Sequence, residues 1–252
     1  MAHKTLIGGT AYDVKSGRAL IGGTGYDIKK SRTLIGGTGY DIPFGKKIAE
    51  LTEGTIIKIN ESGSPVEFYV AKRNYESTLN GYGKTLVVRK DCYNTRTFTA
   101  QNDNHFPTSL LCDWLNETYI GLLDSGVQAA ITTTTFKVWI RGITVTTAEK
   151  KIFLLSATEL GYVHSPSQTQ LAYVEGTKLD ISDLLIPANL NGEAVRQWTR
   201  SNVPGYGSYV CVNNVDGNFG KAQNVMATIG VRPVFALPET LEVDSDFILI
   251  EP

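Results

Sequence analysis

Leu34-Ile35-Gly36-Gly37-Thr38-Gly39-Tyr40-Asp41-Ile42 is the last of three nearly identical segments at the start of the chain. The other two copies begin at Leu6 and Leu20, so the period is 14 residues, and short basic links separate the copies. Each copy surrounds a Gly-Gly pair with β-branched and aromatic residues, a pattern typical of short strands joined by tight turns. Residues 1–44 are therefore predicted to form a β-repeat distinct from the remaining residues, 45–252.

The repeat has too few apolar residues to bury its own surface. Two-stranded pieces are marginal in water, and repeat units normally complete a core with their neighbours. We therefore expect residues 1–44 to be an arm stabilised by other chains, while a flexible tether or a small sheet packed on its own domain remains the alternative. The predicted assembly residues are Leu6, Ile7, Tyr12, Leu20, Ile21, Tyr26, Leu34, Ile35 and Tyr40.

Charge is distributed unevenly along the chain. In total 24 Lys/Arg stand against 25 Asp/Glu, without the strong basic excess of a general nucleic-acid coat. Residues 1–47 hold eight Lys/Arg and three Asp, a net charge of +5, and the remainder holds 16 Lys/Arg and 22 Asp/Glu, a net charge of −6. The arm is expected to meet an acidic partner surface or to pair with its own Asp13, Asp27 and Asp41. Alternatively, its charges only keep an exposed repeat soluble.

The wording of the repeat resembles a known class of sequence. Residues 4–44, and above all Gly17-Arg18-Ala19-Leu20-Ile21-Gly22-Gly23-Thr24-Gly25-Tyr26-Asp27-Ile28, are similar to the N-terminal repeats of tailed-bacteriophage structural proteins. The resemblance implies a virion protein made in the host bacterial cytoplasm. By analogy with viral fibres it favours a homotrimer, joined to other virion proteins through the arm.

The body, residues 45–252, is predicted to be one α+β domain with much irregular structure. Apolar alternation and β-branched residues predict its strands at residues 55–59, 66–70, 85–89, 136–145, 231–237 and 247–250. Ile152–Leu155 is a further apolar run, and long polar loops are expected over residues 165–183 and 201–224.

Helices are expected at three places in the body. Thr108-Ser109 precedes an apolar face, beginning at Leu110, and predicts a capped helix. A second helix is expected within residues 122–130. Ser156-Ala157-Thr158-Glu159 has the spacing of a capping box and predicts the start of a short third helix.

Four phrases in the body carry a second resemblance. Their order and wording are similar to an uncharacterised domain frequent in gut Firmicutes and their phages, thought to share the C-type-lectin-like fold of formylglycine-generating enzymes and phage variable proteins. The Trp-x-Arg-Ser and Gly-x-Arg-Pro phrases are interpreted as structural, an indole and guanidinium groups that pack and pair inside the domain. The phrases are Asp113-Trp114-Leu115-Asn116, Phe153-Leu154-Leu155-Ser156-Ala157-Thr158-Glu159-Leu160-Gly161, Trp198-Thr199-Arg200-Ser201 and Gly230-Val231-Arg232-Pro233-Val234.

Patterns for catalysis and for metal binding are weak. His3, His105 and His164 lack zinc spacing, and Cys92, Cys112 and Cys211 are expected to be buried thiols. The sequence therefore predicts no catalytic residue, metal or cofactor, and the copper-binding cysteine pair of formylglycine-generating enzymes has no counterpart. A glycan-acting enzyme with Asp183 and Glu193 as its carboxylates is one alternative. An exported bacterial surface-binding module is another.

The predicted function is a non-catalytic structural component of a phage virion, as a fibre, adhesin or capsid decoration. Its ligand would be a host-surface glycan or protein, and we expect neither nucleic-acid binding nor membrane insertion. The stretch from Asn202 to Asn224 is rich in Tyr, Asn, Gly and Ser, as adaptable binding surfaces are. The predicted ligand-binding residues are Asn202, Tyr206, Tyr209, Asn213, Asn214, Asn218 and Phe219.

Overall fold

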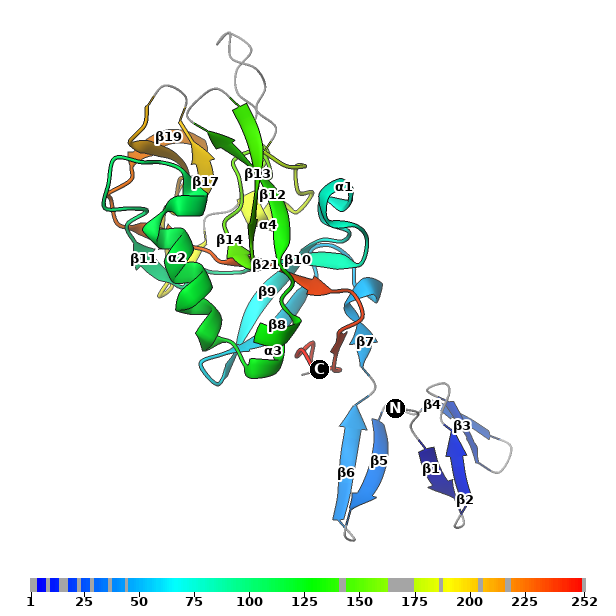
Figure 1. Cartoon of the computed structure of the whole chain (residues 1–252). Helices are drawn as coiled ribbons and strands as arrows, with labels where there is room; N and C mark the ends of the chain where they lie inside the picture. The colour runs from blue at the N-terminus through cyan, green and yellow to red at the C-terminus, as the bar shows by residue number, and fades with distance from the viewer. Residues whose placement is uncertain are drawn as a thin grey trace.

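Two five-stranded sheets form the body of the chain (Figure 1). The computed structural model describes residues 45–140, 144–162, 175–185, 188–203, 206–215 and 219–250, together with the backbone of six strands within residues 4–43. The first sheet consists, in spatial order, of β14 (Ile152–Phe153), β21 (Val234–Pro238), β10 (Lys84–Arg89), β9 (Ser64–Lys72) and β8 (Ile56–Glu61). The second consists of β11 (Asn94–Arg96), β20 (Ile229–Val231), β17 (Gln197–Asn202), β18 (Tyr209–Asn213) and β19 (Phe219–Asn224).

Arg232 and Pro233 carry the chain from the second sheet to the first, because they separate β20 from β21. Strands of the first sheet pair antiparallel, and the second sheet contains a parallel pair, β17 with β20. β8, β9 and β10 confirm the strands predicted near residues 55–59, 66–70 and 85–89. Buried aromatic pairs fill the core, including Phe68 with Phe235 at 5.4 Å between ring centroids.

Two small hairpins, one pair of short strands and several short helices complete the body. The hairpins are β12 (Thr134–Ile140) with β13 (Thr144–Lys150), and β15 (Asn189–Leu190) with β16 (Glu193–Ala194). The pair is β7 (Lys46–Lys47) with β22 (Glu242–Val243), which come from opposite ends of the body. The α-helices are α1 (Ser77–Asn80), α2 (Leu110–Glu117), α3 (Ser125–Ala130) and α4 (Ser182–Leu185). The 3-10 helices are η1 (Ile48–Glu50), η2 (Phe106–Thr108) and η3 (Tyr119–Leu122).

Helix α2 begins where the sequence predicts it. The Ser109 hydroxyl accepts a hydrogen bond from the backbone N–H of Cys112 at 3.1 Å, which satisfies one of the unpaired donors of the first turn. Asn116 then ties the end of the helix to the first sheet, because its side-chain amide donates to the carbonyl of Ile152 at 2.8 Å. The helix predicted within residues 122–130 is confirmed as α3, preceded by η3.

The helix predicted to start at Ser156 is wrong. The capping box itself is present: Ser156 N–H donates to Glu159 Oε2 at 2.8 Å, and Glu159 N–H donates to Ser156 Oγ at 3.0 Å. The segment nevertheless stops after one hydrogen-bonded turn, where Gly161 adopts φ +88°. The left-handed conformation of Gly161 ends the turn, and the Glu159 carboxylate also binds Arg200 from β17, which holds the turn against the second sheet.

Other predicted boundaries also change. The strand predicted at 136–145 is β12 with the first residues of β13, and the final strand predicted at 247–250 is reduced to isolated bridges. The loop predicted over 201–224 is correct only in part, since β18 and β19 lie within it. The apolar Val210 and Val212 favour a core strand inside this stretch, and both are buried on β18. The loop predicted at 165–183 falls largely on residues 163–174, which lie outside the described residues.

Residues 4–43 contain the predicted short strands as three two-stranded hairpins. They are β1 (Lys4–Ile7) with β2 (Thr10–Asp13), β3 (Arg18–Ile21) with β4 (Thr24–Asp27), and β5 (Lys30–Ile35) with β6 (Thr38–Pro43). Their register repeats: a basic residue stands opposite an aspartate in each, as Lys4↔Asp13, Arg18↔Asp27 and Arg32↔Asp41. The side chains of the nine predicted assembly residues lie outside the description.

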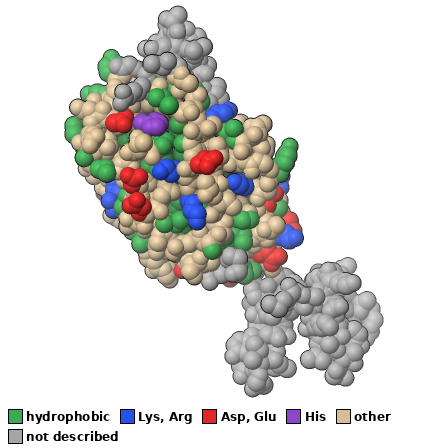
Figure 2. Space-filling model, viewed as in Figure 1, with side chains coloured by type: hydrophobic (Ala, Val, Ile, Leu, Met, Phe, Trp, Pro, Cys, Tyr) green, Lys and Arg blue, Asp and Glu red, His purple; other side chains and the backbone are tan. Residues whose placement is uncertain are grey.

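The fold class is α+β, with mostly strands and few helices, as the sequence predicts. On the face shown in Figure 2, acidic and basic side chains are interspersed among neutral ones. Among the described residues, no helix is long and apolar enough to cross a membrane. On that face, charge alone does not mark a site.

Gly230 in β20 allows the close approach of β20 to the start of β17, the parallel pair of the second sheet. A Cβ atom at this position would lie 2.6 Å from the carbonyl oxygen of Arg196 and 2.8 Å from Cys92 Sγ. Gly230→Ala is therefore expected to lower the free energy of unfolding by about 2 kcal/mol through overpacking against a fixed backbone atom. Urea denaturation of the full chain measures this loss.

The matched control for this substitution is Gly121→Ala. A Cβ there would meet nothing within 4 Å, so we expect a change within about 0.5 kcal/mol. Equal stabilities of the Gly230→Ala and Gly121→Ala chains would contradict the close approach.

Candidate functional site

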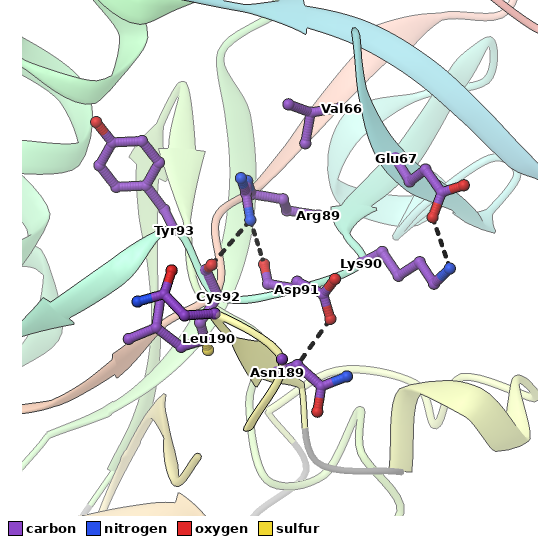
Figure 3. Close-up of a pocket in the computed structure, with 11 residues that line it drawn as sticks. Val66, Glu67, Arg89, Lys90, Asp91, Cys92, Tyr93, Asn189 and Leu190 are labelled. Atoms are coloured by element: carbon purple, nitrogen blue, oxygen red, sulfur yellow. Dashed lines mark hydrogen bonds and ion pairs between the residues drawn. The ribbon is translucent and has the colours of Figure 1, made fainter. Parts of the chain in front are cut away.

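A polar pocket lies between the ends of β9 and β10 and the β15–β16 hairpin (Figure 3). Its volume is about 430 Å³, within the range of small-molecule sites. The lining comes from segments about 100 residues apart in the chain. The lining residues are Val66, Glu67, Arg89, Lys90, Asp91, Cys92, Tyr93, Asn189, Leu190, Asn191 and Gly192.

Arg89 anchors the floor of this pocket. Its guanidinium forms a bidentate ion pair with Glu61, with both N···O distances at 3.0 Å, and also donates to the carbonyls of Asp91 and Cys92 at 2.8 and 2.9 Å. Tyr119 donates its hydroxyl to the same Glu61 carboxylate at 2.5 Å, and burial with the nearby Glu61 charge raises the pKa of Tyr119. The segment after β10 is therefore fixed to the core by a charge-assisted network.

The β15–β16 hairpin forms the opposite wall and is joined directly to that segment. Cys92 N–H donates to the carbonyl of Asn189 at 2.9 Å, and Asn189 N–H donates to Asp91 Oδ1 at 3.1 Å. The turn of the hairpin holds Asn191 at φ +55° and Gly192 at φ +88°, the left-handed pair that suits a two-residue hairpin connection. The two walls therefore form one connected unit.

One end of the pocket is charged and another is aromatic. Lys90 Nζ pairs with Glu67 Oε2 at 2.6 Å, and this contact raises the pKa of Lys90. Tyr93 packs edge-on against Tyr119, at 5.2 Å between ring centroids, and lies 5.7 Å from the Trp114 ring. The aromatic wall is thus supported by side chains from η3 and α2.

The chemistry of the pocket suits binding. Burial raises the pKa of the Cys92 thiol to about 12, so the thiol is protonated at neutral pH and is not an activated nucleophile. Both cations, Arg89 and Lys90, pair with carboxylates. Asp91 uses one oxygen for the Asn189 N–H, and among the described residues its other oxygen has no hydrogen-bond partner.

The predicted ligand face at residues 202–219 is only partly exposed. Asn202, Asn213 and Asn214 are buried, so the expectation that they lie on an accessible face is wrong. Asn202 instead donates to the carbonyl of Trp139 at 3.0 Å, which joins β17 to β12. A buried polar side chain in a strand can thus donate a hydrogen bond to a backbone carbonyl in the interior.

Tyr206 and Tyr209 do lie at the surface, with exposed fractions of 62% and 36%. Their rings pack edge to face at 5.9 Å, and the Asn104 amide donates to both backbone carbonyls at 2.9 Å. Asn218 and the side chain of Phe219 lie outside the described residues. The tyrosine pair is a small exposed surface, separate from the lining of the pocket.

The Trp-x-Arg-Ser and Gly-x-Arg-Pro phrases are structural, as the sequence predicts. Arg200 is buried and forms two ion-pair contacts with Glu159, at 2.6 and 2.9 Å. Trp198 is also buried, and its indole N–H donates to the carbonyl of Arg96 at 2.8 Å. Arg232 is buried and donates to the carbonyl of Arg89 at 2.7 Å, just behind the pocket floor.

Of the other predicted candidates, Cys92 is the one that lines the pocket. Asp183 and Glu193, the carboxylates of the enzyme alternative, are both exposed. The thiols Cys92, Cys112 and Cys211 are buried and free, as expected. His3 and His164 lie outside the described residues, and within the described part of the chain no three His, Cys, Asp or Glu side chains are grouped to hold a metal ion.

Comparison with known families gives one match. A family described as a domain of unknown function (DUF6273) matches residues 82–239, more than half of the chain. The chain belongs to the DUF6273 family. The DUF6273 region contains all four phrases and both walls of the pocket except Val66 and Glu67, which come from β9. No curated protein and no solved structure matches the chain.

The sequence analysis did not find the pocket. Two local signals were available: a run of polar residues, Arg89-Lys90-Asp91, directly after a buried strand, and Asn191-Gly192, the strongest dipeptide signal for a hairpin. Neither indicates that the segments meet across about 100 residues of the DUF6273 domain. That contact depends on the tertiary hydrogen bonds at Asn189.

Proposed function

We propose that the chain is a structural, non-catalytic component of a bacteriophage particle. Residues 1–44 join it to its own copies and to other virion proteins, and the body is displayed to bind the host surface. The observation that carries the proposal is the threefold hairpin with one repeated register. Such a repeat is suited to assembly, since isolated two-stranded hairpins are marginal in water.

The charge pattern of the arm supports assembly without a separate acidic partner. In each hairpin the register sets a Lys or Arg position opposite an Asp position, and oppositely charged cross-strand pairs stabilise a ladder by about 0.2–1 kcal/mol each. The arm can therefore balance part of its own charge, and its remaining contacts come from neighbouring chains. A homotrimer is the symmetric assembly that we propose.

The body is proposed as a C-type-lectin-like display domain. Support comes from its two sheets with short helices, and from a polar pocket whose two cations are already paired with carboxylates. A binding role also agrees with the protonated Cys92 thiol and with Arg200 and Glu159 being paired in the interior. An experimental structure of the body tests the lectin-like topology.

Deletion of residues 1–44 tests the assembly role. We expect the full chain to form a homotrimer and the deleted chain to stay monomeric but folded, because the described side chains of residues 48–249 form a buried core of their own. Sedimentation velocity gives the mass, and circular dichroism reports the fold. Purified phage particles analysed by mass spectrometry should contain the full chain in a fixed ratio to the other virion proteins.

The control is a chain in which residues 1–44 are scrambled, with the same length, composition and charge. It should fail to assemble as the deleted chain does. A full chain that remains monomeric at high concentration, with residues 4–43 protected from hydrogen exchange, would show that the hairpins are stabilised within one chain. Absence from purified particles would overturn the virion proposal.

A further inference from the structure

We propose that the pocket between β10 and the β15–β16 hairpin binds a neutral saccharide unit. This inference rests on the proposed function, a body that binds the host surface, and assigns that binding to a place and a ligand class. The pocket of about 430 Å³ has room for a small ligand rich in hydroxyl groups.

The paired charges of the pocket favour a neutral ligand. Arg89 is committed to Glu61, and Lys90 to Glu67, so an anionic ligand would have to compete with an existing carboxylate at either cation. The Glu61–Arg89 pair is also largely buried, with side-chain exposures of 5% and 12%, so breaking it would leave a buried charge without a partner. A neutral ligand avoids both costs.

Polar groups that remain available suit hydroxyl groups. One carboxylate oxygen of Asp91 accepts no hydrogen bond from the described residues, and the side-chain amides of Asn189 and Asn191 are exposed with no partner among them. A hydroxyl both donates and accepts, so it can donate to Asp91 while accepting from an amide N–H. Figure 3 shows Asp91 and Asn189 close together on the two joined walls.

Tyr93 supplies the apolar surface that a sugar ring requires. Tyr93 lines the pocket, and its ring packs against Trp114 and Tyr119, with the Arg89 guanidinium 5.7 Å from the ring centroid. An aromatic ring face can pack against the C–H face of a sugar while the hydroxyl groups at the ring edge form hydrogen bonds. Because Arg89 fixes the segment that carries Tyr93, the site is organised before the ligand arrives, which reduces the entropy lost on binding.

The test uses the full chain and methyl glycosides of glucose, galactose, mannose and N-acetylglucosamine at millimolar concentrations. Saturation-transfer NMR detects binding, and titration gives the dissociation constant. We expect at least one glycoside to bind to the wild-type chain. The double variant Asn189→Ala/Asn191→Gly should bind it at least about 10-fold more weakly, because two hydrogen-bonding amides are lost. Glycine at 191 preserves the left-handed turn.

Ser62→Gly is the matched control. Ser62 holds φ +54° in the β8–β9 turn, followed by Gly63 at φ +76°, so this substitution makes the same backbone change away from the pocket. It should leave the dissociation constant unchanged, and all three chains should keep similar melting temperatures. Unchanged affinity of the double variant, or no binding of any of the four glycosides, would overturn the saccharide site.

The outcomes for the site and for the proposed function can be separated. A chain that is incorporated into particles but binds no glycoside removes the saccharide site and leaves the virion role intact. A chain that binds a glycoside through Asn189 and Asn191 but is absent from particles supports the saccharide site and removes the virion role.

Discussion

Arg200→Met is expected to lower the free energy of unfolding by about 3–5 kcal/mol, because it leaves the buried Glu159 carboxylate without its counter-charge. Both side chains of this ion pair have an exposed fraction of 0%. Methionine is similar in length and fills the space, so the loss comes mainly from the charge and from the hydrogen bonds. Urea denaturation of the full chain at pH 7 measures it.

The large loss of stability follows from the number of segments to which the Arg200 side chain is hydrogen-bonded. Its guanidinium donates to the carbonyls of Lys137, Leu154 and Glu175, at 3.0, 2.7 and 2.6 Å, besides its two bonds to Glu159. The substitution would therefore remove a donor from the carbonyls of three separate segments, and the bonds to Leu154 and Glu175 are buried. Tyr75, which donates to Glu159 at 2.5 Å, would remain as a neutral partner.

Two further variants separate the charge from the packing. Arg200→Met/Glu159→Gln should recover about 1–3 kcal/mol of coupling energy relative to the sum of the single variants, because the Glu159 charge is removed together with its partner. Arg196→Met is the control, since Arg196 is exposed and its side chain contacts Gln223 at 3.1 Å; it should change stability by less than about 0.5 kcal/mol. Equal losses at positions 196 and 200 would contradict the buried network.

Those parts of the fold that depend on local chemistry could be predicted from the sequence. The β8, β9 and β10 strands follow from β-branched and alternating residues, and α2 follows from Ser109 and an apolar face. Even the structural role of Arg200 could be inferred, because the Trp198-Thr199-Arg200-Ser201 phrase suits an indole and a guanidinium that pack and pair inside the domain. Its partner, Glu159, could not be identified, since the two residues meet only through tertiary structure.

Errors in the sequence analysis have the same cause. The Ser156–Glu159 box is the local signature of a helix start, yet the segment ends at Gly161 after one turn, and its Glu159 carboxylate forms a tertiary ion pair with Arg200. Asn202 lies in a stretch with the composition of a surface loop, yet its side-chain amide donates a hydrogen bond to the backbone carbonyl of Trp139 in the interior. The pocket was missed because its walls meet through backbone hydrogen bonds at Asn189, which no local pattern encodes.

Glu175→Gln is expected to stabilise the chain at pH 8 by about 3 kcal/mol and to have little effect near pH 4.5. Burial raises the pKa of the Glu175 carboxyl from 4.5 to about 7 in the folded chain, against the opposing effects of Arg200 and of hydrogen bonds from Ser201 and Trp139. The difference of about 2.5 pKa units between the folded and the unfolded chain corresponds to about 3 kcal/mol, at about 1.36 kcal/mol per pKa unit.

The sign follows from where the proton is held. Between pH 4.5 and about 7 the folded chain binds this proton and the unfolded chain has released it, so stability falls as the pH rises through that window. Above pH 7 the Glu175 carboxylate is ionised and buried in the folded chain, so the free energy of unfolding is lowered by the full amount. Glutamine has the same shape and no charge, and its carbonyl oxygen can still accept the hydrogen bond that Trp139 N–H donates at 2.9 Å.

The measurement is the free energy of unfolding of the wild-type and Glu175→Gln chains in urea at pH values from 4.5 to 8. The difference between the two curves isolates Glu175, because every other titrating group is shared. Glu193→Gln, at an exposed position, is the control and should give a difference below about 0.5 kcal/mol at every pH. A Glu175→Gln curve parallel to that of the wild type across this range would mean that Glu175 remains ionised in the folded chain. Its burial beside Ser201 would then be offset by Arg200, whose guanidinium already binds the Glu175 carbonyl at 2.6 Å.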